Sequence, residues 1–190
     1  MPVVELEVSI PQDLSAIKLH QYQKYLSVAK GVDEGDKNNE FLNLKALEIF
    51  CGLSLKDSYN LPVSMFESVL KQVSACFDEK TDLVQRFKMT GGDGVTAEFG
   101  FIPNLDKMTF GEYIDLESYI TDWDNMHKAM AVMYRPIVAG KKHLYEIEPY
   151  EGTEKWADVM KDAPVNVALG AIVFFYRLGS KLSRYTMNSL

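Results

Sequence analysis

Hydrophobic residues recur at helical spacing through residues 109–136, the most regular pattern in the chain. Thr109 and Glu112 stand three residues apart, which is the spacing of a capping box, where each side chain bonds the other residue's backbone N–H. The apolar positions that follow are Phe110, Tyr113, Ile114, Tyr119 and Ile120. Between Ile114 and Tyr119 the helical spacing falls on Leu116 or on its neighbour Glu117. The pattern predicts a pair of helices with a break near Thr121 and an end at Pro136.

Similar spacing predicts further helices along the chain. They cover about residues 19–29, 41–51, 55–60, 65–77, 153–161 and 164–185. Gly52 is placed to close the helix before it, and Ser54 to cap the one after it. Ser64 and Glu67 form a second capping-box pattern, and Thr153 precedes a later helix as a cap. We therefore expect a chain that is mostly helical.

A β-hairpin is predicted near residues 86–102. Two extended runs flank the sequence Gly-Gly-Asp-Gly at 91–94, and Asp-Gly between such runs is a strong turn signal. We expect Gly94 to adopt a positive φ. We also expect three residues of the second run to join the core: Phe99, Phe101 and Ile102.

Two other runs predict strands, and together the elements predict an α+β fold. Residues 4–10 alternate between apolar and polar, and residues 144–147 form a short run that ends before Pro149. Helices and strands do not alternate as in βαβ units, so a small antiparallel sheet is expected. A length of 190 residues suits a single domain, 1–190, with a subdivision near residues 80–90 as the alternative.

Charge and composition limit the partners. With 20 basic and 27 acidic residues the net charge is −7, which disfavours nonspecific binding to nucleic acid. The uncharged stretch 163–176 is too short to span a bilayer, which takes about 20 residues, so no membrane association is expected. Cys51 and Cys76 fall on apolar helix faces, where we expect two buried, reduced thiols without metal.

No residue cluster predicts catalysis. Asp124 and His127 could share a helix face, but two ligands do not make a metal site. Glu112 and Asp115 share another face and could form an acid–base pair, although a solvated face is the favoured interpretation. The Gly-rich sequence 91–94 lacks the Lys-Ser/Thr of a phosphate loop, and no Gly-x-Ser-x-Gly elbow occurs. We expect no catalytic residue, cofactor or metal, and no enzyme.

The aromatic residues suggest protein binding. The motifs described above account for few of the aromatic and methionine residues, which number ten Tyr, ten Phe, two Trp and nine Met. Exposed patches of such residues mark protein interfaces. The best candidates for partner contact are on the predicted helix pair: Tyr113, Tyr119, Trp123 and Tyr134. The alternative is that these rings belong to the core. Residues 41–77 also look like a helix-turn-helix, but their acidic residues and the net charge oppose DNA binding.

Residues 49–77, IFCGLSLKDSYNLPVSMFESVLKQVSACF, resemble a helix–turn–helix pattern of bacteriophage tail-assembly chaperones. Residues 98–117, with Tyr-Arg-Pro at 134–136, are similar to small phage morphogenesis proteins. The resemblance implies a non-catalytic assembly protein that binds tail tube, tape-measure or connector subunits in the host cytoplasm, and that can form homo-oligomers. Two alternatives stay open: a permanent structural protein of the virion, such as a head–tail connector or tail component, and an acidic regulatory or inhibitor protein.

Overall fold

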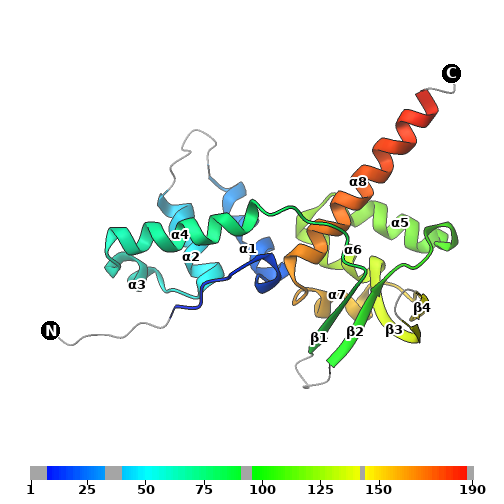
Figure 1. Ribbon diagram of the computed structural model, residues 1–190, viewed down its shortest axis with the longest axis horizontal. Coiled ribbons are helices and arrows are strands. Elements are labelled where there is room, and N and C mark those ends of the chain that lie inside the picture. Colours follow the sequence, from blue (N-terminus) through cyan, green and yellow to red (C-terminus); the bar gives the residue numbers. More distant parts are fainter. Residues whose placement is uncertain (1–7, 33–39, 91–95, 142–143, 188–190) are drawn as a thin grey trace. The chain divides into compact units, whose positions relative to one another are not determined.

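The computed structural model describes residues 8–32, 40–90, 96–141 and 144–187 (Figure 1). Two compact units make up the chain. The first comprises Met1–Ile17 and Gln21–Lys80, and the second comprises Lys18–His20 and Thr81–Leu190. Among the described residues, no helix is long and apolar enough to cross a membrane.

The first unit is helical. It contains η1 (Leu14–Ala16), α1 (Leu19–Lys30, from Gln21 onward), α2 (Glu40–Cys51), α3 (Leu55–Asn60) and α4 (Val63–Phe77). Helix α2 packs against both α3 and α4. Gly52 ends α2 with a φ of 70°, and the Ser54 hydroxyl accepts the Asp57 N–H at 3.1 Å, as the sequence predicts.

Both cysteines lie inside this unit, which confirms the prediction of buried thiols. Burial, together with the neighbouring Cys76, raises the pKa of the Cys51 thiol to about 11. Burial also raises the pKa of Cys76. Each thiol therefore stays protonated, and unreactive, at neutral pH.

The expected capping box at Ser64 is wrong. Helix α4 begins at Val63, so Ser64 already lies in its first turn, and Pro62 occupies the N-cap position without a side-chain hydrogen bond. The Pro62 carbonyl accepts the N–H groups of Met65 and Phe66 at 2.9 and 3.0 Å. Proline pre-sets the φ that a helix entry needs, and this fixed geometry determines the start rather than the serine hydroxyl.

The second unit contains a four-stranded antiparallel sheet. Its strands are β1 (Arg86–Thr90), β2 (Thr96–Phe101), β3 (Tyr134–Lys141) and β4 (Leu144–Ile147), paired in the order β1-β2-β3-β4. The sheet confirms the α+β class and the hairpin. Phe99, Phe101 and Ile102 are buried as expected, whereas Gly94 lies outside the described residues.

Strand β3 is not predicted from the sequence, and the described part of the expected N-terminal strand is not a strand. Tyr134 was expected to close a helix that ends at Pro136, yet it begins a strand in which Pro136 lies opposite Phe99. The Pro136 carbonyl still accepts the Glu148 N–H at 2.9 Å, so the missing proline N–H does not prevent pairing on that side. Of the strand expected at residues 4–10, Val8–Ile10 have no regular structure and the rest lies outside the described residues.

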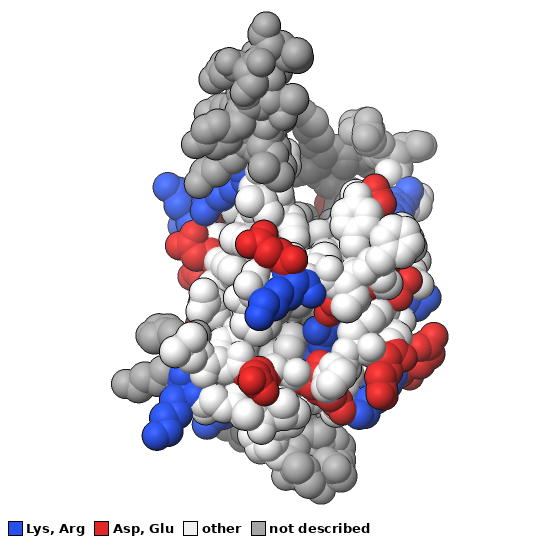
Figure 2. Space-filling view, turned by 90° about the vertical axis from the view of Figure 1, so that its right-hand side faces the viewer, with Lys and Arg blue, Asp and Glu red and all other residues white. Residues whose placement is uncertain are grey.

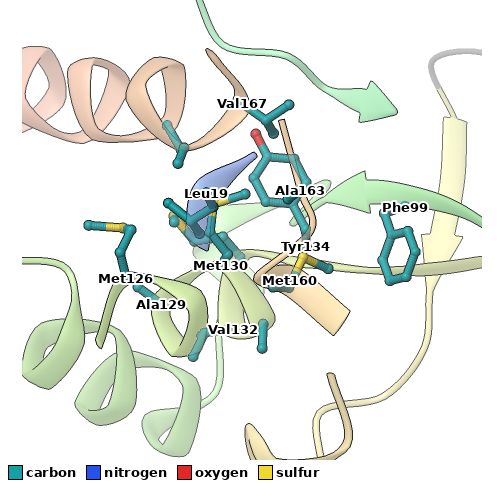
Figure 3. Close-up of a cluster of buried hydrophobic side chains, with 14 of the residues drawn as sticks. Leu19, Phe99, Met126, Ala129, Met130, Val132, Tyr134, Met160, Ala163 and Val167 are labelled. Atoms are coloured by element: carbon teal, nitrogen blue, oxygen red, sulfur yellow. The ribbon is translucent and has the colours of Figure 1, made fainter. Parts of the chain in front are cut away.

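Helices pack on one face of this sheet. They are α6 (Met126–Met133), α7 (Glu154–Met160) and α8 (Val165–Met187), while η2 (Leu105–Lys107), α5 (Phe110–Tyr119) and η3 (Trp123–Asn125) follow β2. Thr153 precedes α7 but makes no side-chain cap bond. Figure 3 shows Leu19, Met130, Tyr134 and Met160 gathered in the resulting core, where each is fully buried.

Tyr145 covers the opposite face of the sheet. Its hydroxyl donates to the Phe101 carbonyl at 2.8 Å and lies 3.2 Å from the Gln85 carbonyl. The ring passes so close to Gly100 that a Cβ there would sit 2.4 Å from the ring carbon Cε2. Gly100 is therefore required for β4 to fold over the sheet.

We predict that Gly100→Ala destabilises the protein by about 1–3 kcal/mol, because the added methyl overpacks against a ring held by hydrogen bonds. Urea unfolding measures the change. The matched control is Gly31→Ala, where the added Cβ makes an ordinary contact of 3.5 Å with the Val28 carbonyl. Equal stability of the two variants would contradict this packing.

Candidate protein-binding surface

Helix α5 begins with the capping box that the sequence predicts. The Thr109 N–H donates to Glu112 Oε2 at 2.7 Å, and the Thr109 hydroxyl donates to the same oxygen at 2.8 Å. In return, the Glu112 N–H donates to Thr109 Oγ1 at 3.3 Å. These bonds fix both the first turn of the helix and the direction in which the Glu112 side chain points.

Glu112 points inward and forms a buried ion pair with Arg135. Arg135 Nη2 donates to Glu112 Oε1 at 2.5 Å, and the two side chains are only 7% and 5% exposed. Arg135 Nη1 donates to the Val132 carbonyl at 3.1 Å, and the guanidinium carbon lies 5.3 Å from the centre of the Tyr150 ring. The pair thus connects α5 to the start of β3.

The environment keeps Glu112 ionised. Burial acts to raise the pKa of this carboxyl, but the hydrogen bonds from Thr109 and Arg135 outweigh it and hold the pKa below its ordinary value. The carboxylate is therefore charged at neutral pH, and it compensates the charge of the buried guanidinium. A carboxylate locked in this way is not available as a general base.

The inward position of Glu112 turns apolar side chains outward. Successive helical residues are rotated by about 100°, so residues at spacing i, i+3 and i+4 share a face. Phe110 is 79% exposed, Tyr113 52% and Ile114 41%, whereas Leu116 on the other side is buried. We call these three exposed residues the α5 apolar face.

Helix α5 thus departs in its first half from an ordinary amphipathic helix, which buries its apolar residues and exposes its charges: Glu112 is buried while Phe110, Tyr113 and Ile114 are exposed. Figure 2 shows the side of the second unit on which α5 begins, where uncharged surface lies between scattered acidic and basic side chains. Exposed aromatic and aliphatic side chains grouped on one helix face are typical of a protein-binding surface.

The four aromatic residues predicted to bind a partner fall into different environments. Tyr113 lies on the α5 apolar face. Tyr119 and Trp123 are half-buried against the core, and Lys128 Nζ lies 5.2 Å from the Tyr119 ring centre. The prediction of partner contact is wrong for Tyr134. This residue is fully buried, and its hydroxyl donates to the Val84 carbonyl at 2.8 Å. It begins a central strand rather than ending a surface helix, so it cannot touch a partner.

Two residues of the α5 apolar face were missed as candidates. Phe110 and Ile114 are visible in the helical pattern, but only the aromatic residues Tyr113, Tyr119, Trp123 and Tyr134 were named as candidates. The capping box predicts that the Glu112 side chain bends back to the Thr109 N–H, but it does not predict that Glu112 is buried. The partner Arg135 lies 23 residues away, however, and no local pattern identifies it.

The other chemical candidates do not converge. Asp115, on the same helix as Glu112, accepts a hydrogen bond from the Tyr150 hydroxyl and does not pair with Glu112. The solvated face favoured for these two carboxylates is wrong for Glu112, which is buried. Within the described part of the chain, no group of three or more His, Cys, Asp or Glu side chains could hold a metal ion.

Comparison of the chain with protein-family models, with curated proteins and with solved structures finds no match. The α5 apolar face and its buried ion pair are therefore the features of the molecule that bear on its function.

We predict that Glu112→Gln lowers the free energy of unfolding at pH 7 by about 3–5 kcal/mol, because it leaves the Arg135 charge buried without compensation. The folded-state pKa of Glu112 is depressed. Its contribution is therefore complete above the unfolded-state pKa of about 4.3, and it is lost as the pH falls through the folded-state value.

Urea unfolding of wild type and Glu112→Gln between neutral and acidic pH tests both statements. The difference between the two proteins should shrink once the pH falls below the ordinary Glu range. The control Glu117→Gln changes an exposed carboxylate on the same helix and should have little effect. A difference that persists unchanged at acidic pH would argue against a stabilising Glu112 carboxylate.

Proposed function

We propose that this protein is a non-catalytic assembly protein of a bacteriophage, which binds a tail component through the α5 apolar face. The observation that carries the proposal is the outward orientation of Phe110, Tyr113 and Ile114 on a helix whose inner face is fixed by a buried ion pair. Exposed aromatic side chains are unfavourable in water unless a partner covers them.

The arrangement suits helix-in-groove recognition. In this mode a helix inserts side chains at spacing i, i+3 and i+4 into an apolar groove of the partner. Phe110 and Tyr113 are rigid aromatic anchors of the kind that supply most of the binding energy at protein interfaces. Because the capping box and the ion pair already hold α5 in place, little conformational entropy is lost when it binds.

The partner class comes from the resemblance to tail-assembly chaperones. Tail tube and tape-measure subunits carry surfaces that become buried when they polymerise, and a chaperone covers them until then. A connector subunit would offer a similar surface. The net charge of −7 is compatible with binding such proteins in the host cytoplasm and disfavours a nucleic-acid partner.

We predict that the double variant Phe110→Ser/Tyr113→Ser loses capture of the tail tube or tape-measure protein in a pull-down from co-expressing cells. Loss of a central aromatic anchor weakens binding by about 2 kcal/mol or more, which is roughly thirtyfold in Kd. Both side chains are exposed, so the variant should unfold at the wild-type urea concentration.

The matched control is Tyr59→Ser, which removes an aromatic ring that is 76% exposed in the first unit. An equal loss of capture in this control would show that the α5 apolar face is not the binding surface. Mass spectrometry of purified phage particles separates the two roles: a chaperone is absent from mature particles, and a permanent structural protein is present. Stoichiometric presence together with failure to capture any tail protein would contradict the chaperone proposal.

A further inference from the structure

The outer edge of β1 is open to pairing with a further strand. β1 is one end of the sheet order β1-β2-β3-β4, and in Figure 1 no described strand lies beyond it. The Phe101 N–H donates to the Gln85 carbonyl at 2.8 Å, and these two residues continue the register of β1 with β2. Hydrogen-bonded pairs alternate with non-hydrogen-bonded pairs along an antiparallel ladder, so the N–H and C=O groups of Lys88 and Thr90 point away from β2.

These outward backbone groups of Lys88 and Thr90 form a template for another strand. Among the described residues, no other segment forms a backbone hydrogen bond with them. An edge strand that presents such groups in a row pairs readily with an extended segment of another chain. The side chains of β1 determine which segment fits.

The two faces of β1 differ in chemistry. Phe87 and Met89 face the core, but they are only partly buried at this edge. The other face carries two cations, Arg86 and Lys88. Arg86 forms an ion pair with Glu98 at 2.8 Å, whereas the ammonium of Lys88 is exposed and forms no ion pair within the described part of the chain. A strand that completes this edge therefore needs acidic side chains on one face and apolar side chains on the other.

The N-terminal sequence of the chain has this pattern. Residues 1–7 lie outside the described residues, but their sequence includes the run Val4-Glu5-Leu6-Glu7. Side chains alternate along an extended segment, so the two glutamates share one face and the two aliphatic residues share the other. Pro2, which lacks the N–H that a ladder needs, lies before the run.

One antiparallel register matches every position of this run with β1. It places acidic residues opposite basic ones and aliphatic residues opposite the partly buried ones: Glu5 with Lys88, Glu7 with Arg86, Val4 with Met89, and Leu6 with Phe87. Opposite charges and apolar pairs across two strands are stabilising, and a shift by one residue would exchange the two faces. The other edge strand, β4, fits less well because it carries Glu146 and no basic residue.

The structure of the single chain indicates which copy supplies the segment. Val8 follows the run and would lie opposite Gln85 in this register, yet Val8–Ile10 have no regular structure. The Cys76 thiol donates to the Pro11 carbonyl at 3.4 Å, so this part of the chain belongs to the first unit, whereas β1 belongs to the second. We propose that residues 4–7 of one copy of the chain add as a strand to the β1 edge of a second copy. This contact does not involve the α5 apolar face.

The experiment is sedimentation velocity of the full-length protein over a range of concentrations. Wild type should associate as its concentration rises. Glu5→Lys and Lys88→Glu each place like charges opposite one another, so each should weaken association about tenfold. A mixture of the two variants should associate again, because the native segment of Lys88→Glu meets the native edge of Glu5→Lys. Pairing within one molecule would not respond to mixing.

The matched controls make the same charge changes on the exposed face of α4. Glu67→Lys and Lys71→Glu should each associate like wild type, and mixing them should change nothing. Hydrogen exchange locates the contact: the Lys88 and Thr90 amides of wild type should become protected as the concentration rises.

Three results would overturn the proposal. The first is a wild-type protein that stays monomeric up to about 1 mM, a range in which even a weak contact is populated. The second is a mixture of Glu5→Lys and Lys88→Glu that associates no better than either variant alone. The third is a monomer whose Lys88 and Thr90 amides are already protected, which would assign the segment to the edge of its own molecule.

Discussion

The buried ion pair between Glu112 and Arg135 determines how α5 is presented to solvent. Two charges that are at most 7% exposed lose most of their hydration, and their mutual attraction barely offsets that loss. The pair is tolerated because Glu112 also accepts two hydrogen bonds from Thr109 and Arg135 donates one to Val132. The arrangement contributes specificity: only one rotation of α5 satisfies all these groups, and that rotation places Phe110, Tyr113 and Ile114 outside.

The sheet determines the position of Arg135, the second partner of the ion pair. Side chains alternate between the two faces of a strand, so Tyr134 enters the core while its neighbour Arg135 points to the opposite face. On that face Arg135 meets Glu112 and the Tyr150 ring. One arginine thus orients the α5 apolar face.

Local signals in the sequence were sufficient for elements whose ends are set by neighbouring residues. The Thr109 capping box, the Gly52 helix end and the hairpin at residues 86–102 are all confirmed because each depends on contacts a few residues apart. The Ser64 box failed because Pro62 fixes the helix entry two residues earlier. Strand β3 was missed because its residues continue a helical pattern, and its pairing with β2 is not encoded locally. The α5 apolar face could not be predicted, since the burial of Glu112 depends on Arg135, 23 residues further along the chain.

Hydroxyl-radical footprinting of α5 tests most directly whether the ion pair holds the apolar face outward. In the wild-type protein at neutral pH, Phe110 and Tyr113 should be oxidised rapidly and Leu116 slowly, in keeping with their exposure. Arg135→Leu leaves the Glu112 charge without a buried partner, so we expect that charge to move into water and α5 to turn or detach. Oxidation of Leu116 should then rise, and that of Phe110 should fall if α5 turns. Protection of Phe110 and Tyr113 in the wild-type protein, or an unchanged oxidation pattern in Arg135→Leu, would contradict this account.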